Sequence, residues 1–152
     1  MESFTQEQIL DVDQEVLWDF ISTPSNLNTI TPEWLDFRMV SEQAPSIYNG
    51  LLIEYEIHLP LLGRKKWVSE IKNVKPGRSF VDEQKKGPYR YWHHYHELQR
   101  VSETKTRMFD LVSYDVGWGP FGKLADHIYV KRNIRKIFSY RKEALKKLFN
   151  ET

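Results

Sequence analysis

The sequence predicts an α+β fold in which a curved antiparallel sheet of about six or seven strands wraps around one long C-terminal helix. Three observations predict it. The last thirty or so residues follow a helical pattern of apolar positions. The middle of the chain is a run of short alternating segments separated by turn residues. Two short helical patterns interrupt this run directly after its first segment.

The C-terminal segment from Gly119 to Phe149 predicts a single amphipathic helix. Its apolar residues recur every three or four positions, and no proline or glycine follows Gly122 within it. They are Leu124, Ile128, Ile134, Ile137, Phe138, Leu145 and Leu148. At the usual rise per residue the helix is on the order of 40 Å long, enough to lie across a whole sheet.

The N-terminal part begins with a predicted strand from Phe4 to Val12. Asp13 then has the character of a helix N-cap, and the apolar residues that follow it predict a short helix that ends at Thr23-Pro24. A second short helix is predicted for Ser25 to Ile30, ended by Thr31-Pro32.

The remaining strands are predicted to follow one another as an antiparallel meander, because turn dipeptides such as Pro76-Gly77 and Gly87-Pro88 separate them. Leu51 to Leu59 alternates most clearly between apolar and polar residues. The predicted strands are Phe37–Ser41, Leu51–Leu59, Lys66–Val74, Ser79–Gln84, Tyr89–Arg100 and Lys105–Tyr114.

Composition indicates one globular domain spanning residues 1–152. The chain has no cysteine, and its N-terminus lacks the basic and apolar stretches of a signal peptide, so we expect a cytoplasmic protein. No apolar stretch approaches the length of a membrane span. The net charge of +1 predicts no nucleic-acid partner.

The basic residues are unevenly placed, because nine Lys and Arg lie between Lys123 and Lys147, against only Asp126 and Glu143. The simpler interpretation is the solvated outer face of a helix whose inner face is buried. The alternative is a weak contact with an anionic surface, either a membrane or a nucleic acid.

The best candidates for binding or catalytic residues lie on the strand predicted for Tyr89–Arg100, where Trp92, His94 and His96 share one face. Asp110 and Tyr114 take the matching face of the next strand, and Asp82 that of the preceding one. If these strands are neighbours, two histidines and two aspartates face one interior.

Three interpretations of this cluster remain open. It forms a self-satisfied Asp–His network that stiffens the sheet, a polar anchor for a ligand head group, or a catalytic or metal site. In the third case the candidate catalytic residues are His94, His96 and Asp110, because histidine can act as a general base near neutral pH. A metal would use the same His-x-His pair with an Asp, but the spacing alone is a weak signal, and we expect neither a metal nor a cofactor.

Aromatic side chains are predicted to line a cavity between sheet and helix, and the alternative is a filled core without a void. The predicted lining from the sheet is Tyr55, Trp67, Trp92 and Tyr114. Phe121, Leu124 and Ile128 are predicted to close the wall from the helix.

Several motifs resemble a bacterial ligand-binding branch of the START and Bet v 1-like (SRPBCC) superfamily, which has the helix-grip fold and includes polyketide cyclases and lipid-transfer domains. The resemblance covers nearly the whole chain, and it departs at Asp115-Val116-Gly117-Trp118, where the family has a plainer Leu-Pro entry to the helix. The motifs are Pro24-x-Asn26-Leu27, Phe80 to Gln84 with Gly87-Pro88, Trp92 to His96, Asp110 with Tyr114, Gly119 to Gly122, and Arg135 to Arg141. The resemblance implies an interior cavity that holds a hydrophobic or amphipathic small molecule.

Binding of such a molecule is therefore the first functional hypothesis. The second is an enzyme of the cyclase or hydrolase type, with His94 or His96 as the acid–base and Asp82 or Asp110 as its orienting group. The third is an interaction module that uses the basic C-terminal helix. The sequence contains no phosphate-binding glycine loop, no G-x-S-x-G and no H-E-x-x-H motif, which disfavours nucleotide-dependent enzymes and serine hydrolases.

Overall fold

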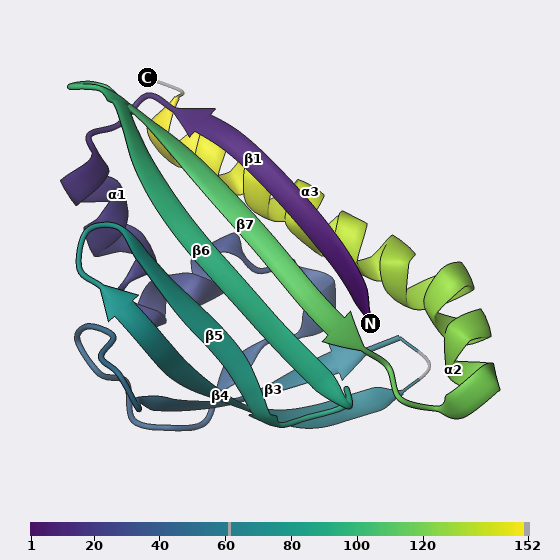
Figure 1. The fold of residues 1–152 in the computed structure, drawn as a ribbon. Helices are drawn as coiled ribbons and strands as arrows, with labels where there is room; N and C mark the ends of the chain where they lie inside the picture. Colours follow the sequence, from purple (N-terminus) through teal and green to yellow (C-terminus); the bar gives the residue numbers. More distant parts are fainter. Residues whose placement is uncertain (61, 151–152) are drawn as a thin grey trace.

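A computed structural model describes residues 1–60 and 62–150 and confirms the predicted α+β architecture (Figure 1). Its described part contains one seven-stranded sheet, short helices after the first strand, and a long C-terminal helix. The strands are β1 (Glu2–Leu10), β2 (Arg38–Met39), β3 (Leu52–Leu59), β4 (Gly63–Lys75), β5 (Ser79–Lys86), β6 (Tyr91–Ser102) and β7 (Lys105–Asp115).

The strand order is β1-β7-β6-β5-β4-β3-β2, and every neighbouring pair is antiparallel. Strands β2 to β7 therefore form the predicted meander, and β1 returns to pair with β7. The first edge strand β2 is shorter than predicted, with two residues instead of the five from Phe37 to Ser41. Its pairing ends because the amides of Val40 and Ser41 both donate to the carbonyl of Glu54, at 2.8 and 3.1 Å.

The predicted helices after the first strand are present. The N-cap role of Asp13 is confirmed, since its Oδ1 accepts a hydrogen bond from the amide of Glu15 at 2.8 Å. Helix α1 (Gln14–Ile21) follows it, and the second segment is the 3₁₀ helix η1 (Pro24–Ile30) with Pro24 in its first turn. A third short turn, η2 (Glu33–Leu35), was not predicted.

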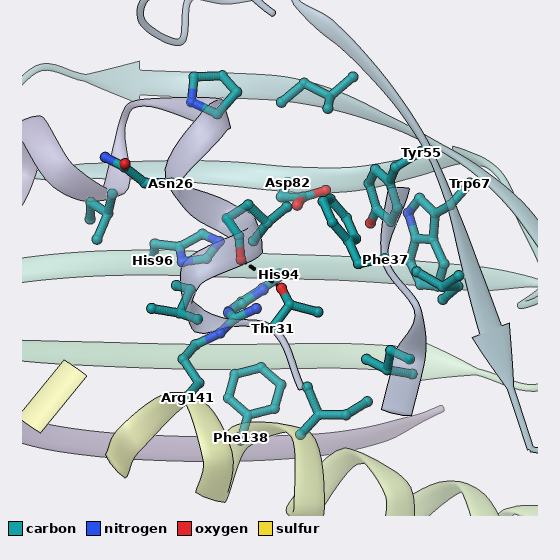
Figure 2. A pocket seen from close by; sticks show the side chains of 18 of the residues that line it. Asn26, Thr31, Phe37, Tyr55, Trp67, Asp82, His94, His96, Phe138 and Arg141 are labelled. Atoms are coloured by element: carbon teal, nitrogen blue, oxygen red, sulfur yellow. Dashed lines mark hydrogen bonds between the residues drawn. The ribbon is translucent and has the colours of Figure 1, made fainter. Parts of the chain in front are cut away.

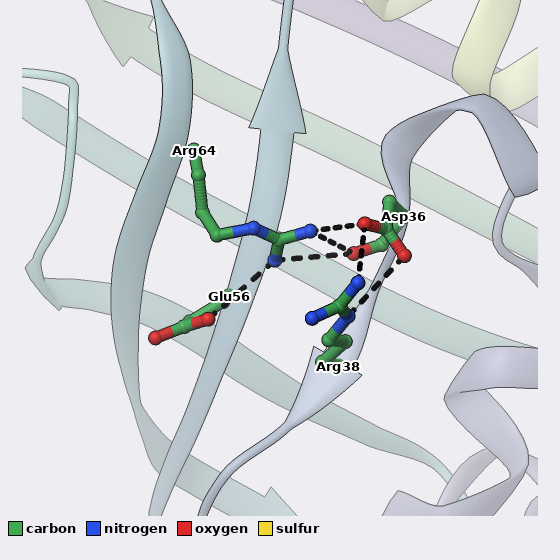
Figure 3. A network of polar contacts seen from close by, with 4 residues as sticks. All are labelled: Asp36, Arg38, Glu56 and Arg64. Carbon is green, nitrogen blue, oxygen red and sulfur yellow. Dashed lines mark hydrogen bonds and ion pairs between the residues drawn. The ribbon is translucent and has the colours of Figure 1, made fainter.

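A charged network fastens η2 to the neighbouring strands (Figure 3). Asp36, in a left-handed conformation with φ of 43°, ends η2 and pairs with both Arg38, at 3.0 Å, and Arg64. Arg64 also lies 3.5 Å from Glu56 of β3. These groups are largely exposed, so the pairs contribute little free energy each. The adjacent Leu35 lies in the core and is 4% exposed.

The C-terminal helix runs from Gly119 to Phe149 as predicted, but it is not a uniform α-helix. It consists of α2 (Gly119–Ala125), a π-helical turn η3 (Asp126–Val130) and α3 (Lys131–Phe149). The α3 helix lies beside β1 (Figure 1), where Gln6 and Gln8 donate side-chain hydrogen bonds to the carbonyls of Phe138 and Lys142, at 3.1 and 2.8 Å.

The π turn overturns the predicted inner face of the N-terminal part of this helix. Phe121, Leu124 and Ile128 are 80%, 59% and 61% exposed, so they do not close the wall of a cavity. One extra residue in a turn rotates everything before it by roughly 100° relative to α3. Asp126 is buried instead, where its carboxylate accepts a hydrogen bond from the hydroxyl of Tyr114 at 2.8 Å. None of the helices among residues 1–60 and 62–150 is sufficiently long and apolar to span a bilayer.

Candidate functional site

A cavity of about 160 Å³ lies between the sheet, the short helices after β1 and α3 (Figure 2). Most of its lining is aliphatic or aromatic, which contradicts the alternative of a core without a void. Six of the residues predicted for the site have side chains in its wall. They are Tyr55, Trp67, Asp82, Trp92, His94 and His96.

The other predicted residues do not line the cavity. Asp110 and Tyr114 are 3% and 1% exposed and lie behind the lining layer, where Asp110 contacts the histidines and Tyr114 contacts Asp126. Phe121, Leu124 and Ile128 face away from the cavity, because the π turn rotates this part of the helix relative to α3. A ligand-binding role for any of the predicted residues remains a prediction.

Strand register brings the polar cluster together as predicted. His94 stands opposite Asp82 on β5, while His96 stands opposite Phe80 on β5 and Asp110 on β7. The two histidines share one face of β6, so their rings meet, with centroids 3.7 Å apart. The ring of His96 also stacks on Phe80, with 4.2 Å between centroids and 15° between planes.

The two histidines are held differently. His94 Nε2 lies 2.8 Å from Asp110 Oδ1 and donates a hydrogen bond to it. His96 Nδ1 lies 3.1 Å from the same oxygen, but its direction is unsuitable for a hydrogen bond, and neither of its ring nitrogens has a partner among the described residues. His94 therefore belongs to a structural pair, whereas His96 offers unused polar atoms at the cavity wall.

Burial sets the protonation of this cluster. It lowers the pKa of His94 to about 3; the adjacent His96 lowers that pKa further, and the hydrogen bond and charge of Asp110 act in the opposite direction. Burial alone would raise the pKa of Asp110, but the hydrogen bond from His94 and the nearby His96 ring hold that pKa well below its usual range. At neutral pH His94 is therefore a neutral donor to a charged Asp110.

The pKa of His94 predicts that acid destabilises the fold. A histidine in the unfolded chain binds its proton near pH 6.5. Between about pH 6.5 and about pH 3 the unfolded chain therefore binds more protons than the folded chain, and the free energy of unfolding decreases as the pH is lowered. The lowered pKa of Asp110 causes a further loss of unfolding free energy as the pH falls below about 4. Urea denaturation from pH 7.5 to 4.5 should show a loss larger by roughly 1–3 kcal/mol in the wild type than in His94→Gln. Equal losses of unfolding free energy in the two proteins would contradict a neutral, buried His94 in the folded state.

The same pKa bears on what the cluster can do chemically. A general base works best when its pKa lies near the operating pH, and His94, with a pKa of about 3, is a weak base. Asp82 is also buried, and burial raises its pKa. His94, His96 and Asp110 are the only group of three metal-ligating side chains that the described residues bring together, with ligand atoms within 4.8 Å of one another. Their donor types suit a metal, but Asp110 Oδ1 already accepts from His94.

An aromatic wall closes the end of the cavity opposite His96. Trp67 lies at its centre, stacked on Tyr55 with 5.9 Å between centroids and set edge-to-face against Trp92 at 5.3 Å. Tyr89 stacks on Trp92 at 5.2 Å and also lines the cavity. Sequence analysis placed Tyr89 at the start of a strand and did not assign it to the site, although an aromatic residue beside the Gly87-Pro88 turn was a usable signal.

Arg141 is the most important cavity residue that sequence analysis missed. It extends from α3 into the cavity (Figure 2), and its guanidinium carbon lies 5.0 Å from the centroid of the Phe138 ring. A signal existed, because Arg141 follows Phe138 by three positions and precedes Leu145 by four, the spacing of one helical face. It was counted instead with the basic residues of the outer face.

Buried polar atoms without a hydrogen-bond partner gather around the cavity. Among the described residues these atoms are Trp67 Nε1, Ser69 Oγ, Asp82 Oδ1, both ring nitrogens of His96, and Arg141 Nε. All but the hydroxyl of Ser69 belong to residues that line the cavity. Folded proteins usually satisfy such atoms, so their concentration at one void indicates a place for a polar group from outside the chain.

No family model and no curated protein matches the chain. Solved structures do match it. A protein from Chromobacterium violaceum is similar over 100% of both chains, with a TM-score of 0.74 and 13% identity. The di-domain ARO/CYC protein BexL is similar over 96% of this chain and 47% of its own, with a TM-score of 0.68 and 17% identity.

A START superfamily protein from Mycobacterium smegmatis is similar over 96% of this chain and 98% of its own, with a TM-score of 0.64 and 6% identity. The chain shares the helix-grip fold with these structures. In this helix-grip protein the cavity lies between the sheet and α3.

Proposed function

We propose that this protein binds a small hydrophobic or amphipathic molecule in the cavity between sheet and helix. The gathering of unpartnered buried polar atoms at an otherwise apolar void supports this most strongly. A ligand with an apolar body and a polar end would pack against the apolar wall and hydrogen-bond the buried polar atoms that no described residue partners.

The cavity volume limits the size of the ligand. An engineered cavity of about 150 Å³ in another protein holds one benzene molecule. The present cavity, at about 160 Å³, therefore suits a single aromatic ring or a short aliphatic chain with one polar group. Titration calorimetry with such compounds tests the proposal, and saturable binding of one molecule per chain is the expected result. Absence of saturable binding across acids, alcohols and amides of this size would contradict it.

A second candidate function is docking on an anionic membrane surface, which the exposed apolar residues around α2 favour. Phe121, Leu124 and Ile128 project outward on the N-terminal part of the long helix. Next to them Arg132, Arg135 and Lys136 line a shallow groove together with Trp34. Apolar side chains flanked by basic ones are typical of surfaces that insert into the headgroup region of anionic bilayers.

We expect the triple variant Arg132→Glu, Arg135→Glu, Lys136→Glu to lose binding to phosphatidylserine vesicles by at least tenfold in a co-sedimentation assay at low salt, because each basic residue contributes about 1 kcal/mol near such a surface. Lys131 is left unchanged because it pairs with Glu2 at 2.9 Å. The control reverses the charge of three exposed lysines near the other end of the helix by replacing each with glutamate: Lys142, Lys146 and Lys147.

Two results of this assay would remove membrane docking as a candidate. One is equal vesicle binding by the triple variant and the control. The other is wild-type binding that does not weaken as salt is raised, because attraction between exposed charges is screened by salt.

A further inference from the structure

The guanidinium of Arg141 lacks a counter-charge. It lines the cavity, its Nε is buried without a hydrogen-bond partner among the described residues, and no carboxylate among them lies at ion-pair distance from it. Its guanidinium carbon lies 5.0 Å from the centroid of the Phe138 ring. Arg141 is half-buried, and only its Nε is buried without a partner among the described residues, so an anion in the cavity would pair with a charge that is partly shielded from water.

The acidic residues nearest to the cavity do not supply that anion. The Oδ1 atom of Asp110 accepts from His94 and lies behind the cavity wall. Asp82 does line the cavity, and burial raises its pKa against the opposite effects of Ser69 and Arg141. It also stands on β5 opposite His94, whereas Arg141 enters from the helix side (Figure 2).

His96 supplies a second polar group for an anion. Neither of its buried ring nitrogens makes a hydrogen bond among the described residues, although Nδ1 lies 3.1 Å from Asp110 Oδ1, which leaves Nε2 as the nitrogen without a nearby acceptor. Its ring is fixed between Phe80 and His94, so it cannot turn freely to find another partner. An imidazole carries at least one N–H donor in either protonation state. One wall of the cavity thus presents a histidine donor, and another presents the arginine fork.

We propose that the ligand of this cavity is a small monocarboxylate with a single-ring aromatic or short aliphatic body, bound through its carboxylate to Arg141 and His96. This rests on the proposed function and names its ligand class. A planar carboxylate matches the guanidinium fork, which can donate two parallel hydrogen bonds to it. A phosphate carries up to two charges and is harder to desolvate beside one arginine. The apolar body lies against Trp67, Trp92 and the aliphatic residues of the wall.

Titration calorimetry with matched ligand pairs tests this proposal. The probes are cinnamate, phenylacetate and hexanoate, each compared with its neutral amide. In the wild type at least one acid should bind tenfold or more tightly than its amide. Arg141→Gln should weaken binding of that acid by 10- to 100-fold and leave the amide within about threefold, because a hydrogen bond between charged groups is lost only for the acid. Lys146→Gln, which removes a positive charge from the exposed face of the same helix, is the control and should bind like the wild type.

The outcomes separate this proposal from the proposed function. If an acid and its amide bind equally well, or if Arg141→Gln binds acids like the wild type, the carboxylate site is wrong while the ligand-binding function stands. If no member of any pair binds, both are wrong. The comparison of acids with amides needs only the wild type, so it decides the question even if Arg141→Gln fails to fold. Arg141→Lys, which keeps the charge without the fork, should show an intermediate affinity.

Discussion

Replacing Ile137 with tryptophan is expected to weaken small-molecule binding by at least 100-fold while the protein still folds. Ile137 lines the cavity from α3 and packs beside Leu35 and Trp67. An indole at this position would occupy much of a space of about 160 Å³. Overfilling a well-packed region costs about 1–3 kcal/mol, which most domains of this size tolerate.

The matched control is Ile128→Trp, the same substitution on the same helix at a side chain that is 61% exposed. It should bind the acid selected by calorimetry like the wild type. Both variants should show wild-type far-ultraviolet circular dichroism and cooperative unfolding in urea. Undiminished binding by a folded Ile137→Trp variant would place the binding site outside the cavity.

The Asp110→Ala variant is expected to lose about 3 kcal/mol of unfolding free energy at pH 7.5, which is the largest stability effect that we predict for one polar side chain. Asp110 is 3% exposed and is the acceptor for His94 at 2.8 Å. Its removal leaves a buried N–H group without a partner and opens a void behind the cavity wall. Urea denaturation with unchanged slope is the appropriate measurement.

Ser113→Ala is the control for this variant, since Ser113 lies on β7 with its side chain on the opposite face from Asp110. Its effect should stay within about 0.5 kcal/mol. A loss below about 1 kcal/mol in Asp110→Ala would mean that the Asp–His pair does not stabilise the sheet. In that case the pair would be a candidate for a functional rather than a structural role.

The sheet could be predicted from the sequence because its residues alternate and its turns are marked. Tyr55 and Trp67 face the same interior because they lie directly opposite each other on β3 and β4. The same logic placed Asp82, His94 and Asp110 together, since one turn dipeptide or a short loop separates each pair of strands and fixes their order.

The helix wall could not be predicted in the same way, because the π turn at Asp126–Val130 leaves no simple mark in the sequence. A uniform helical period carried Leu124 toward the interior, whereas the structure exposes Leu124 and buries Asp126. Arg141 was missed for another reason. Composition treats every basic residue of an amphipathic helix as part of its outer face, and only the packing of Phe138 shows that Arg141 turns inward.

The most direct test of the account is native mass spectrometry of the wild type and of Ile137→Trp, each incubated with small hydrophobic acids, alcohols and amides extracted from the cells that produce the protein. We predict one organic adduct per chain in the wild type, retained by Ile128→Trp and absent from Ile137→Trp. No adduct in the wild type, or the same adduct in Ile137→Trp, would contradict a ligand-binding cavity between sheet and helix.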